Sequence, residues 1–328
     1  MLGGLKGLLL LCLYAFTGCD MVKFMQASIG ETGEFFCGNS DNWSPENPGS
    51  TWKRFVQNVT FNTPFILPPV IFLTVTYLES VRNFNVRFLA KFDHVSERGF
   101  EAMCLKWSDT KIIEMRVNWL AISGAYLEKA SEFYCDADTK WTPGHWNPKD
   151  PKEAGKRSSR NVQFPTEFSE TPLLVLSVTY LDCDHRYNLR FQAQVENVTR
   201  SGFSAMCYTW ADTRIWEMKI SWLAIPTYFL GQTGEFYCGS SNSWTKGLGN
   251  PKHPKETGRR FVQNITFPTP FIFQPSVFLS VTYLYSDRLS DLRFLTQVDH
   301  VSRNGFGAMC YTWSDTKIYE MRITWFAF

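Results

Sequence analysis

Two kinds of side chain recur at fixed places in this 328-residue chain and could bind a sugar. A tryptophan stands three residues after a cysteine in three segments, at Trp107, Trp210 and Trp313. An arginine lies twenty residues before each of them, at Arg87, Arg190 and Arg293. An indole face suits the apolar face of a sugar ring, and a guanidinium fork can hold adjacent hydroxyls or a carboxylate. The alternatives are a tryptophan that caps a sheet edge and an arginine in a surface salt bridge.

Strand alternation predicts where these tryptophans point. Trp107 has the opposite parity to Cys104, so an inward sulfur implies an outward indole, beside the polar turn Ser108-Asp109-Thr110. A second recurring tryptophan falls on the buried parity and is assigned to the core, at Trp119, Trp222 and Trp325.

The elements that must position these residues are repeated units. Gly-Phe-x-Ala-Met-Cys begins at Gly99, Gly202 and Gly305, which gives a period of 103 residues. From Gly99 to Ala121 the copies align without a gap, and 13 of 23 positions are identical in all three. This repeat predicts three tandem domains, at residues 32–122, 130–225 and 233–328, each long enough for its own small core.

Within a unit the apolar residues recur at every second position. Ile113, Met115, Val117 and Trp119 alternate with polar neighbours, which indicates a strand with one buried face. Five or six such strands per hundred residues, with no convincing helical stretch, predict an all-β chain of antiparallel β-sandwiches.

Each unit has one early and one late cysteine, and the simplest pairing is three disulfides within the units. The predicted pairs are Cys37–Cys104, Cys135–Cys207 and Cys238–Cys310. Cys183 has no counterpart in the other units. It could bridge to another molecule, pair with Cys19, or remain an inert free thiol.

The first residues read as an export signal. Lys6 precedes an apolar run of about ten residues and small residues follow it, so residues 1–19 are predicted to be a secretory signal peptide. The run is too short to cross a membrane, so no membrane insertion is expected. Four Asn-x-Ser/Thr sequons fit secretion, at Asn42, Asn58, Asn197 and Asn264. A net charge of +2 without a long basic run argues against nucleic acid as a partner.

Signatures of catalysis and of metal binding are missing. No G-x-S-x-G, H-E-x-x-H or phosphate-binding glycine loop occurs, so no enzyme activity and no cofactor are predicted. His94 and His300 are equivalent but have no histidine partner in the middle unit, and Asp182 with Asp184 lacks a third carboxylate for calcium. We predict no metal site.

The third unit carries a set of motifs known from one family. They are Asn264–Phe267, Pro275–Thr282, Asp291–Arg293, Gly305–Trp313 and Ile323–Trp325. In these the chain resembles the H-type lectins, of the snail agglutinin and discoidin II C-terminal domain type, and the resemblance covers all three units. It implies a six-stranded antiparallel sandwich, trimeric assembly, and binding of galactose or N-acetylgalactosamine in clefts between neighbours. A chain of three units could build such a trimer from itself or combine with other chains.

The resemblance also assigns roles to residues. The sugar-facing arginine of the family falls on Arg87, Arg190 and Arg293, and its stacking tryptophan on Trp107, Trp210 and Trp313. Its acidic ligand falls on Glu153 and Glu256 but on Ser50 in the first unit. The histidine after the tryptophan in snail agglutinins is replaced by Ser108, Ala211 and Ser314. These departures weaken the expectation of N-acetylgalactosamine selectivity and predict a weak first site.

The sequence therefore favours a secreted, extracellular, multivalent lectin whose partners are glycans on glycoproteins or cell surfaces. The alternative is an extracellular structural or cell-adhesion protein that kept the sandwich and lost sugar binding.

Overall fold

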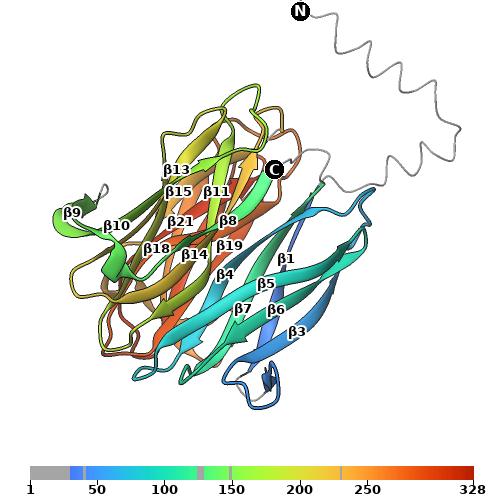
Figure 1. The fold of residues 1–328 in the computed structure, drawn as a ribbon. Helices are drawn as coiled ribbons and strands as arrows, with labels where there is room; N and C mark the ends of the chain where they lie inside the picture. Colours follow the sequence, from blue (N-terminus) through green and yellow to red (C-terminus); the bar gives the residue numbers. More distant parts are fainter. Residues whose placement is uncertain (1–29, 40–41, 124–128, 148–149, 230) are drawn as a thin grey trace, which may run out of the picture.

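The computed structural model describes residues 30–39, 42–123, 129–147, 150–229 and 231–328, without side-chain detail for residues 129, 145–147 and 150–154. The predicted signal peptide, with Cys12 and Cys19, lies outside the described residues. In the described part the regular structure is strands and two short 3-10 turns, η2 (Asp138–Lys140) and η3 (Ser241–Ser243). This confirms the all-β prediction (Figure 1).

Each unit supplies seven strands. The first has β1 (Gly30–Asn39), β2 (Ser44–Pro45), β3 (Lys53–Thr60), β4 (Val70–Ser80), β5 (Val86–Ser96), β6 (Gly99–Lys106) and β7 (Ile112–Ile122). The second has β8 (Lys129–Cys135), β9 (Thr142–Asn147), β10 (Asp150–Gln163), β11 (Leu173–Cys183), β12 (Leu189–Glu196), β13 (Gly202–Trp210) and β14 (Ile215–Ile225). The third has β15 (Gln232–Tyr237), β16 (Thr245–Gly249), β17 (Thr257–Thr266), β18 (Val277–Ser286), β19 (Leu292–Ser302), β20 (Gly305–Trp313) and β21 (Ile318–Ala327). Six of the seven are the predicted sandwich strands, and the short β2, β9 and β16 lie in the long loop after the first cysteine.

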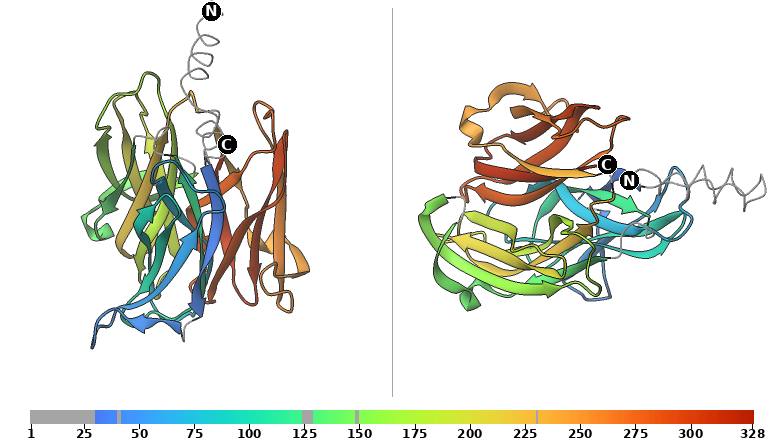
Figure 2. Two further views of the ribbon diagram at one scale, coloured as in Figure 1. Left: turned by 90° about the vertical axis from the view of Figure 1, so that its right-hand side faces the viewer. Right: turned by 90° about the horizontal axis from the view of Figure 1, so that it is seen from above.

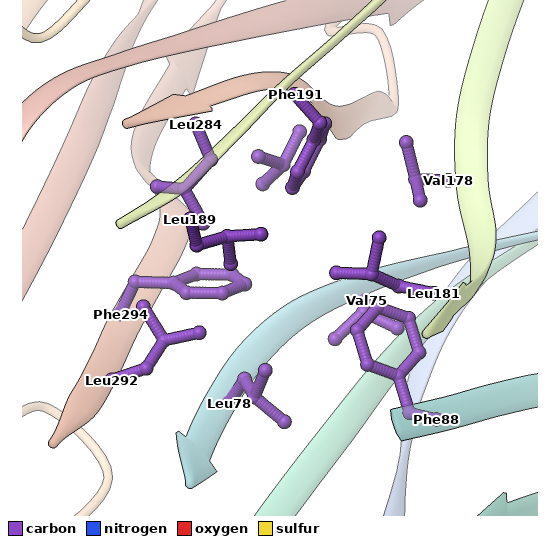
Figure 3. Close-up of a pocket in the computed structure, with 11 residues that line it drawn as sticks. Val75, Leu78, Phe88, Val178, Leu181, Leu189, Phe191, Leu284, Leu292 and Phe294 are labelled. Carbon is purple, nitrogen blue, oxygen red and sulfur yellow. The ribbon is translucent and has the colours of Figure 1, made fainter. Parts of the chain in front are cut away.

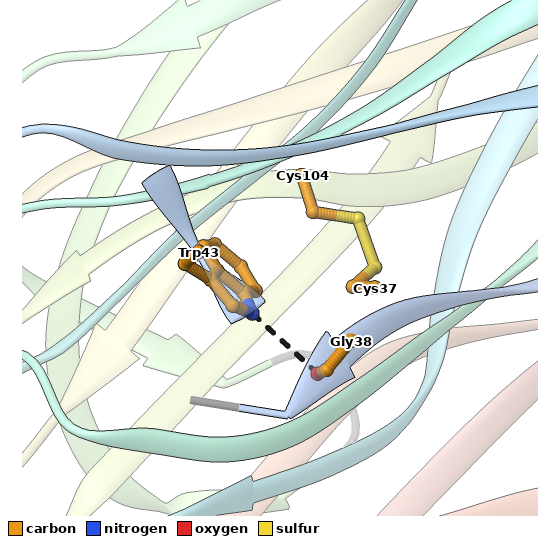
Figure 4. Close-up of a disulfide and its surroundings, with 4 residues drawn as sticks. All are labelled: Cys37, Gly38, Trp43 and Cys104. Carbon is orange, nitrogen blue, oxygen red and sulfur yellow. Dashed lines mark hydrogen bonds between the residues drawn. A yellow bond between two sulfur atoms is a disulfide. The ribbon is translucent and has the colours of Figure 1, made fainter. Parts of the chain in front are cut away.

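Each unit is a sandwich closed by one disulfide. The three predicted pairs, Cys37–Cys104, Cys135–Cys207 and Cys238–Cys310, are confirmed. Beside the first, the Trp43 indole N–H donates to the carbonyl of Gly38 at 3.5 Å, which anchors the start of the long loop (Figure 4). Trp119, Trp222 and Trp325 are 3–4% exposed in the cores, as predicted. A disulfide that closes about 70 residues stabilises a small domain by roughly 4 kcal/mol in the chain-entropy model.

The sheets continue from one unit into the next. Strands β4 and β19, β5 and β11, and β12 and β18 pair antiparallel across the units. Three seven-stranded sheets result, each made of four strands from one unit and three from a neighbour. Because every unit contributes to two sheets, the three units form a closed ring (Figure 2). We call the three lines of pairing the first-second, second-third and third-first seams.

Apolar side chains fill the middle of the ring. Equivalent residues of all three units meet there, including Leu78, Leu181 and Leu284, and Phe88, Phe191 and Phe294 (Figure 3). The cavity between them has a volume of only about 10 Å³. The axis of the ring is therefore packed as a shared core.

A register shift near the start of the last strand of each unit changes one predicted orientation. Between Glu79 and Ser80 the pairing moves from Glu114 to Ile112, so Ile112 is 0% exposed while Ile113 is 38% exposed. The prediction that Ile113 faces the core was wrong, because period-two alternation breaks at a bulge. The same shift occurs at the equivalent places in β14 and β21.

The two ends of the ring differ. Strands β4 and β7 run in opposite directions, which places the turns 81–85 and 107–111 at one end and both Gly30 and Phe328 near the other. We call the first the loop end. None of the described helical segments is long and apolar enough to cross a membrane.

Candidate functional site

The three repeated arginines lie on the seams. Each stands directly opposite a polar residue of the next unit in the strand pairing: Arg87 opposite Asp182, Arg190 opposite Tyr285, and Arg293 opposite Glu79. The strand register thus brings each fork to the boundary between two units, near the loop end.

These arginines are held by acceptors from both units. Arg87 Nε donates to Asp182 and Arg293 Nε donates to Glu79, each at 2.8 Å. Arg190 Nη2 reaches the Tyr285 hydroxyl at 3.2 Å. Sequence reasoning missed these partners, because which strand edges pair is a long-range property that local alternation does not encode.

A second group missed by the sequence analysis is the aspartate of the turn after each tryptophan. Asp109, Asp212 and Asp315 each accept a hydrogen bond from the arginine Nη1 of their own unit. Their side chains remain 45%, 54% and 52% exposed. The preceding residue has a positive φ of 54–58° in all three units, which turns the aspartate back toward the arginine. The recurring Trp-x-Asp-Thr pattern was the available signal.

The repeated tryptophans point outward from their own units but are not exposed. Trp107, Trp210 and Trp313 are 8%, 2% and 3% exposed. Their faces are covered by a tyrosine of the next unit, at ring-centroid distances of 4.9–5.0 Å, in the pairs Trp107–Tyr180, Trp210–Tyr283 and Trp313–Tyr77. The expected exposure of these indoles was wrong, because a single unit cannot reveal what its neighbour covers.

The other face of each tryptophan is covered from its own unit, in two different ways. Tyr208 and Tyr311 stack on Trp210 and Trp313. The first unit has Leu105 at that position, and there Trp52 stacks on Trp107 at 4.4 Å and 16°. Both arrangements leave the indole between two aromatic rings.

Other aromatic side chains are accessible beside two of the arginines. Trp216 is half-buried and lies with its ring centroid 5.3 Å from the guanidinium carbon of Arg87. Tyr319 is half-buried and stacks on Tyr285 at 4.4 Å. Ile113 is the third equivalent. The bulge in each last strand turns these residues outward, which alternation alone could not predict.

The predicted acidic ligands have different surroundings. Glu256 is exposed, and its carboxylate accepts from Asn250 Nδ2 at 3.2 Å. Ser50 Oγ accepts the backbone N–H of Trp52 at 3.0 Å. The side chain of Glu153 lies outside the described residues.

The long loop of the third unit crosses the third-first seam. Lys252 Nζ lies 2.8 Å from Glu34 and His253 Nε2 lies 2.6 Å from Glu114. Burial raises the pKa of the nearby Glu79 above its ordinary value, against the opposing effect of Arg293. This seam therefore concentrates carboxylates under a basic loop.

With this geometry established, comparison with known proteins identifies the family. A family model described as the H-type lectin domain matches residues 56–122, 159–225 and 262–328, which together are more than half of the chain. The chain belongs to the H-type lectin domain family.

Individual relatives cover less of this lectin chain. A protein described as ATP synthase subunits region ORF 7, from Fuscovulum blasticum, is 40% identical over 72 residues, 22% of this chain and 63% of that protein. One discoidin-1 polypeptide from Dictyostelium discoideum is 30% identical over 64 residues, 19% of this chain and 25% of its own. The chain thus spans less than two thirds of either relative.

The solved structure of wild-type discoidin II from Dictyostelium discoideum also matches this lectin chain. It is 12% identical, covers 59% of this chain and 93% of its own, and has a TM-score of 0.22.

Cys183 and the sequons of the lectin chain are placed as follows. Cys183 is unpaired and 2% exposed, and burial raises the pKa of its thiol. Because thiol exchange needs an accessible thiolate, this placement favours the inert-thiol alternative. The four sequon asparagines, Asn42, Asn58, Asn197 and Asn264, are exposed. His94 and His300 lie among no metal-binding group in the described part of the chain.

Proposed function

We propose that this protein is a secreted, multivalent carbohydrate-binding protein that takes galactose or N-acetylgalactosamine-type sugars at its three seams. The observation that carries the proposal is the repeated seam geometry. Each of the three seams sets a fixed arginine beside an exposed aspartate, at one end of the ring.

A sugar at a seam would meet complementary groups. The exposed carboxylates of Asp109, Asp212 and Asp315 can accept hydrogen bonds from sugar hydroxyls while the arginines hold those carboxylates in place. Trp216 and Tyr319 offer partly exposed rings for the apolar face of a sugar. We assign the buried Trp107, Trp210 and Trp313 to support of the seam rather than to stacking on the sugar.

The arrangement also suits avidity. Weak single sites gain strength when several engage one glycan-bearing surface, and all three seams present their aspartates at the loop end. The proposed partners are therefore glycans displayed densely on glycoproteins or cell surfaces.

The test is binding of the purified protein to a broad glycan panel, with free galactose and N-acetylgalactosamine as competitors. The matched variant is the triple substitution Asp109→Asn, Asp212→Asn and Asp315→Asn, whose side chains are exposed and whose loss leaves the cores intact. The control replaces Asp93 and Asp299, which are exposed and distant from the repeated arginines. We expect the triple variant to lose competable binding to neutral glycans and the control to keep it.

One observation favours the alternative of an extracellular adhesion or structural protein. Both faces of each repeated tryptophan are covered by protein rings, so the strongest predicted sugar contact is already occupied. A well-folded, correctly disulfide-bonded protein that binds no glycan on the panel would support this alternative.

A further inference from the structure

The three seams differ in what neutralises the arginine. Arg293 is bonded to three carboxylates, Glu79, Asp291 and Asp315. Arg87 is bonded to two, Asp182 and Asp109.

Arg190, on the second-third seam, has only Asp212 among the described carboxylates within ion-pair distance. Its other partners are the neutral oxygens of Thr213 and Tyr285.

The missing carboxylate leaves a donor of Arg190 unused. In the other two seams the arginine Nε donates across the seam to an acidic residue, at 2.8 Å. In the second-third seam that residue is Tyr285, whose ring centroid lies 4.5 Å from the guanidinium carbon. Arg190 Nε is buried and has no hydrogen-bond partner. An under-neutralised guanidinium that is 7% exposed attracts an anion more strongly than one in water does.

A second polar group on the same strand face also lacks a partner. Gln192 is 2% exposed, and its Oε1 atom accepts no hydrogen bond. The equivalent residues of the other units are the apolar Leu89 and Leu295. Only this seam, among the described residues, therefore pairs an open guanidinium donor with an open amide acceptor two residues along the strand.

The carboxylate that now occupies Arg190 is exchangeable. Asp212 is 54% exposed, on a turn whose preceding residue, Ala211, has a positive φ of 54°. A ligand carboxylate or sulfate can replace it on Nη1 without leaving Asp212 desolvated. Around Arg87 and Arg293 the same exchange leaves Asp182, or Glu79 and Asp291, facing the incoming anion, and their like charge opposes it.

We propose that the second-third seam binds an anionic saccharide, one that carries a carboxylate or a sulfate, while the other two seams accept neutral sugars. This inference rests on the proposed function. It adds that one chain reads two classes of glycan at the same end of the ring.

The test compares binding of lactose, sialyllactose and sulfated lactose to the full-length protein, at low and high salt. The two acidic probes distinguish carboxylate from sulfate. We expect an acidic probe to bind about tenfold more tightly than lactose at low salt, and to lose that advantage at high salt because screening weakens charge pairing.

Two substitutions locate the effect. Tyr285→Glu restores the cross-seam carboxylate of the other units and should abolish the preference for acidic probes while lactose binding is kept. Asp212→Asn removes the internal competitor and should strengthen binding of the acidic probes. Asp109→Asn and Asp315→Asn should not, because Asp182 or Glu79 still opposes the anion. Arg98→Gln, an exposed arginine at the opposite end of the unit, controls for general attraction to positive charge.

The outcomes separate the two proposals. Equal binding of neutral and acidic probes, or an acidic preference that survives Tyr285→Glu and is unchanged by Asp212→Asn, overturns this inference and leaves the proposed lectin function intact. Failure of the wild-type protein to bind any probe, neutral or acidic, overturns the proposed function as well. Circular dichroism of each variant confirms that it is folded.

Discussion

Around the seam tryptophans, single residues decide how closely two strands can approach. Gly258 stands opposite Trp313, and a Cβ built there would lie 2.1 Å from the carbonyl oxygen of Thr312 and 2.7 Å from the Tyr311 hydroxyl. Gly155 has the same surroundings opposite Trp210. The first unit has Trp52 at this position and Leu105 in place of the tyrosine. Glycine with tyrosine, or tryptophan with leucine, are therefore two solutions to covering one indole face.

We predict that Gly258→Ala destabilises the third unit by about 1–3 kcal/mol, because the clash is with backbone and cannot be relieved by a side-chain rotation. The measurement is the free energy of unfolding in urea. Gly247→Ala is the comparison, since Gly247 has open space around its Cβ position but a positive φ. Equal or smaller loss for Gly258→Ala would show that strands β17 and β20 separate easily.

Asp184 gives a residue-scale prediction about pH. Burial tends to raise the pKa of its carboxyl, but hydrogen bonds from the Arg186 side chain and backbone outweigh this and hold the pKa below its ordinary value. A lowered folded-state pKa means that the stabilisation is fully present above the unfolded-state pKa, about 3.9. It is lost as the pH falls through the lower folded-state value.

We therefore expect Asp184→Asn to lower the melting temperature at neutral pH, with the difference from wild type shrinking below about pH 4. Thermal unfolding followed by circular dichroism across that range measures it. Asp136→Asn, at a carboxylate that is 69% exposed, serves as the control and should change little at any pH. A difference that grows on acidification would contradict the sign.

Cys183 should be inert in the native protein. At 2% exposure the thiol is shielded from alkylating reagents, so mass spectrometry should detect no modification until denaturant is added, and one modified thiol per mature chain afterwards. Rapid native labelling, or a disulfide-linked dimer on a non-reducing gel, would instead support the intermolecular bridge.

At the scale of strands, the seams are ordinary antiparallel pairing between units. Tyr180 to Cys183 pair with Leu89 to Val86, and the apolar axis covers one side of this pairing. Buried ladder hydrogen bonds open only in large unfolding events. We predict that amides of Leu181 and Phe88 exchange with solvent as slowly as those inside a unit, such as Val117.

Hydrogen exchange resolved by fragment mass spectrometry checks this prediction. The two-residue strand β2 at the end of its sheet is the internal reference for fast exchange. Seam amides that exchange at the rate of β2 would mean that the units part readily in solution, and the proposed binding geometry would then be transient.

The element scale also shows what the sequence could and could not predict. The core tryptophans and the cysteine pairs followed from alternation and repeat spacing, because those properties are local or are repeated three times. The half-buried Trp216 and Tyr319 were missed because a bulge reverses the alternation just before them. The cross-seam residues Asp182, Tyr285 and Glu79 were missed because they depend on which edge strands of different units meet.

For the whole molecule, the ring makes the units mutually dependent. Each contributes several large apolar side chains to the axis, in the third unit Val281, Leu284, Leu292 and Phe294. Burying four such side chains contributes roughly 6–12 kcal/mol, by the area-transfer estimate. That is comparable to the whole stability of a small domain, about 5–15 kcal/mol. A unit expressed alone would have to expose this face, together with the unpaired edges of β18 and β19.

We predict that residues 233–328 alone either fail to fold or assemble into a homotrimer that rebuilds the seams. In such a trimer Arg293 would face Tyr285 of a neighbour, the residue that faces Arg190 in the complete chain. Light scattering coupled to size exclusion gives the mass, and circular dichroism reports folding. Adding Leu284→Asp and Phe294→Asp should abolish any trimer. A stable, folded monomer would show that each sandwich is self-sufficient, and the shared axis would then order the three seams without being needed to fold the units.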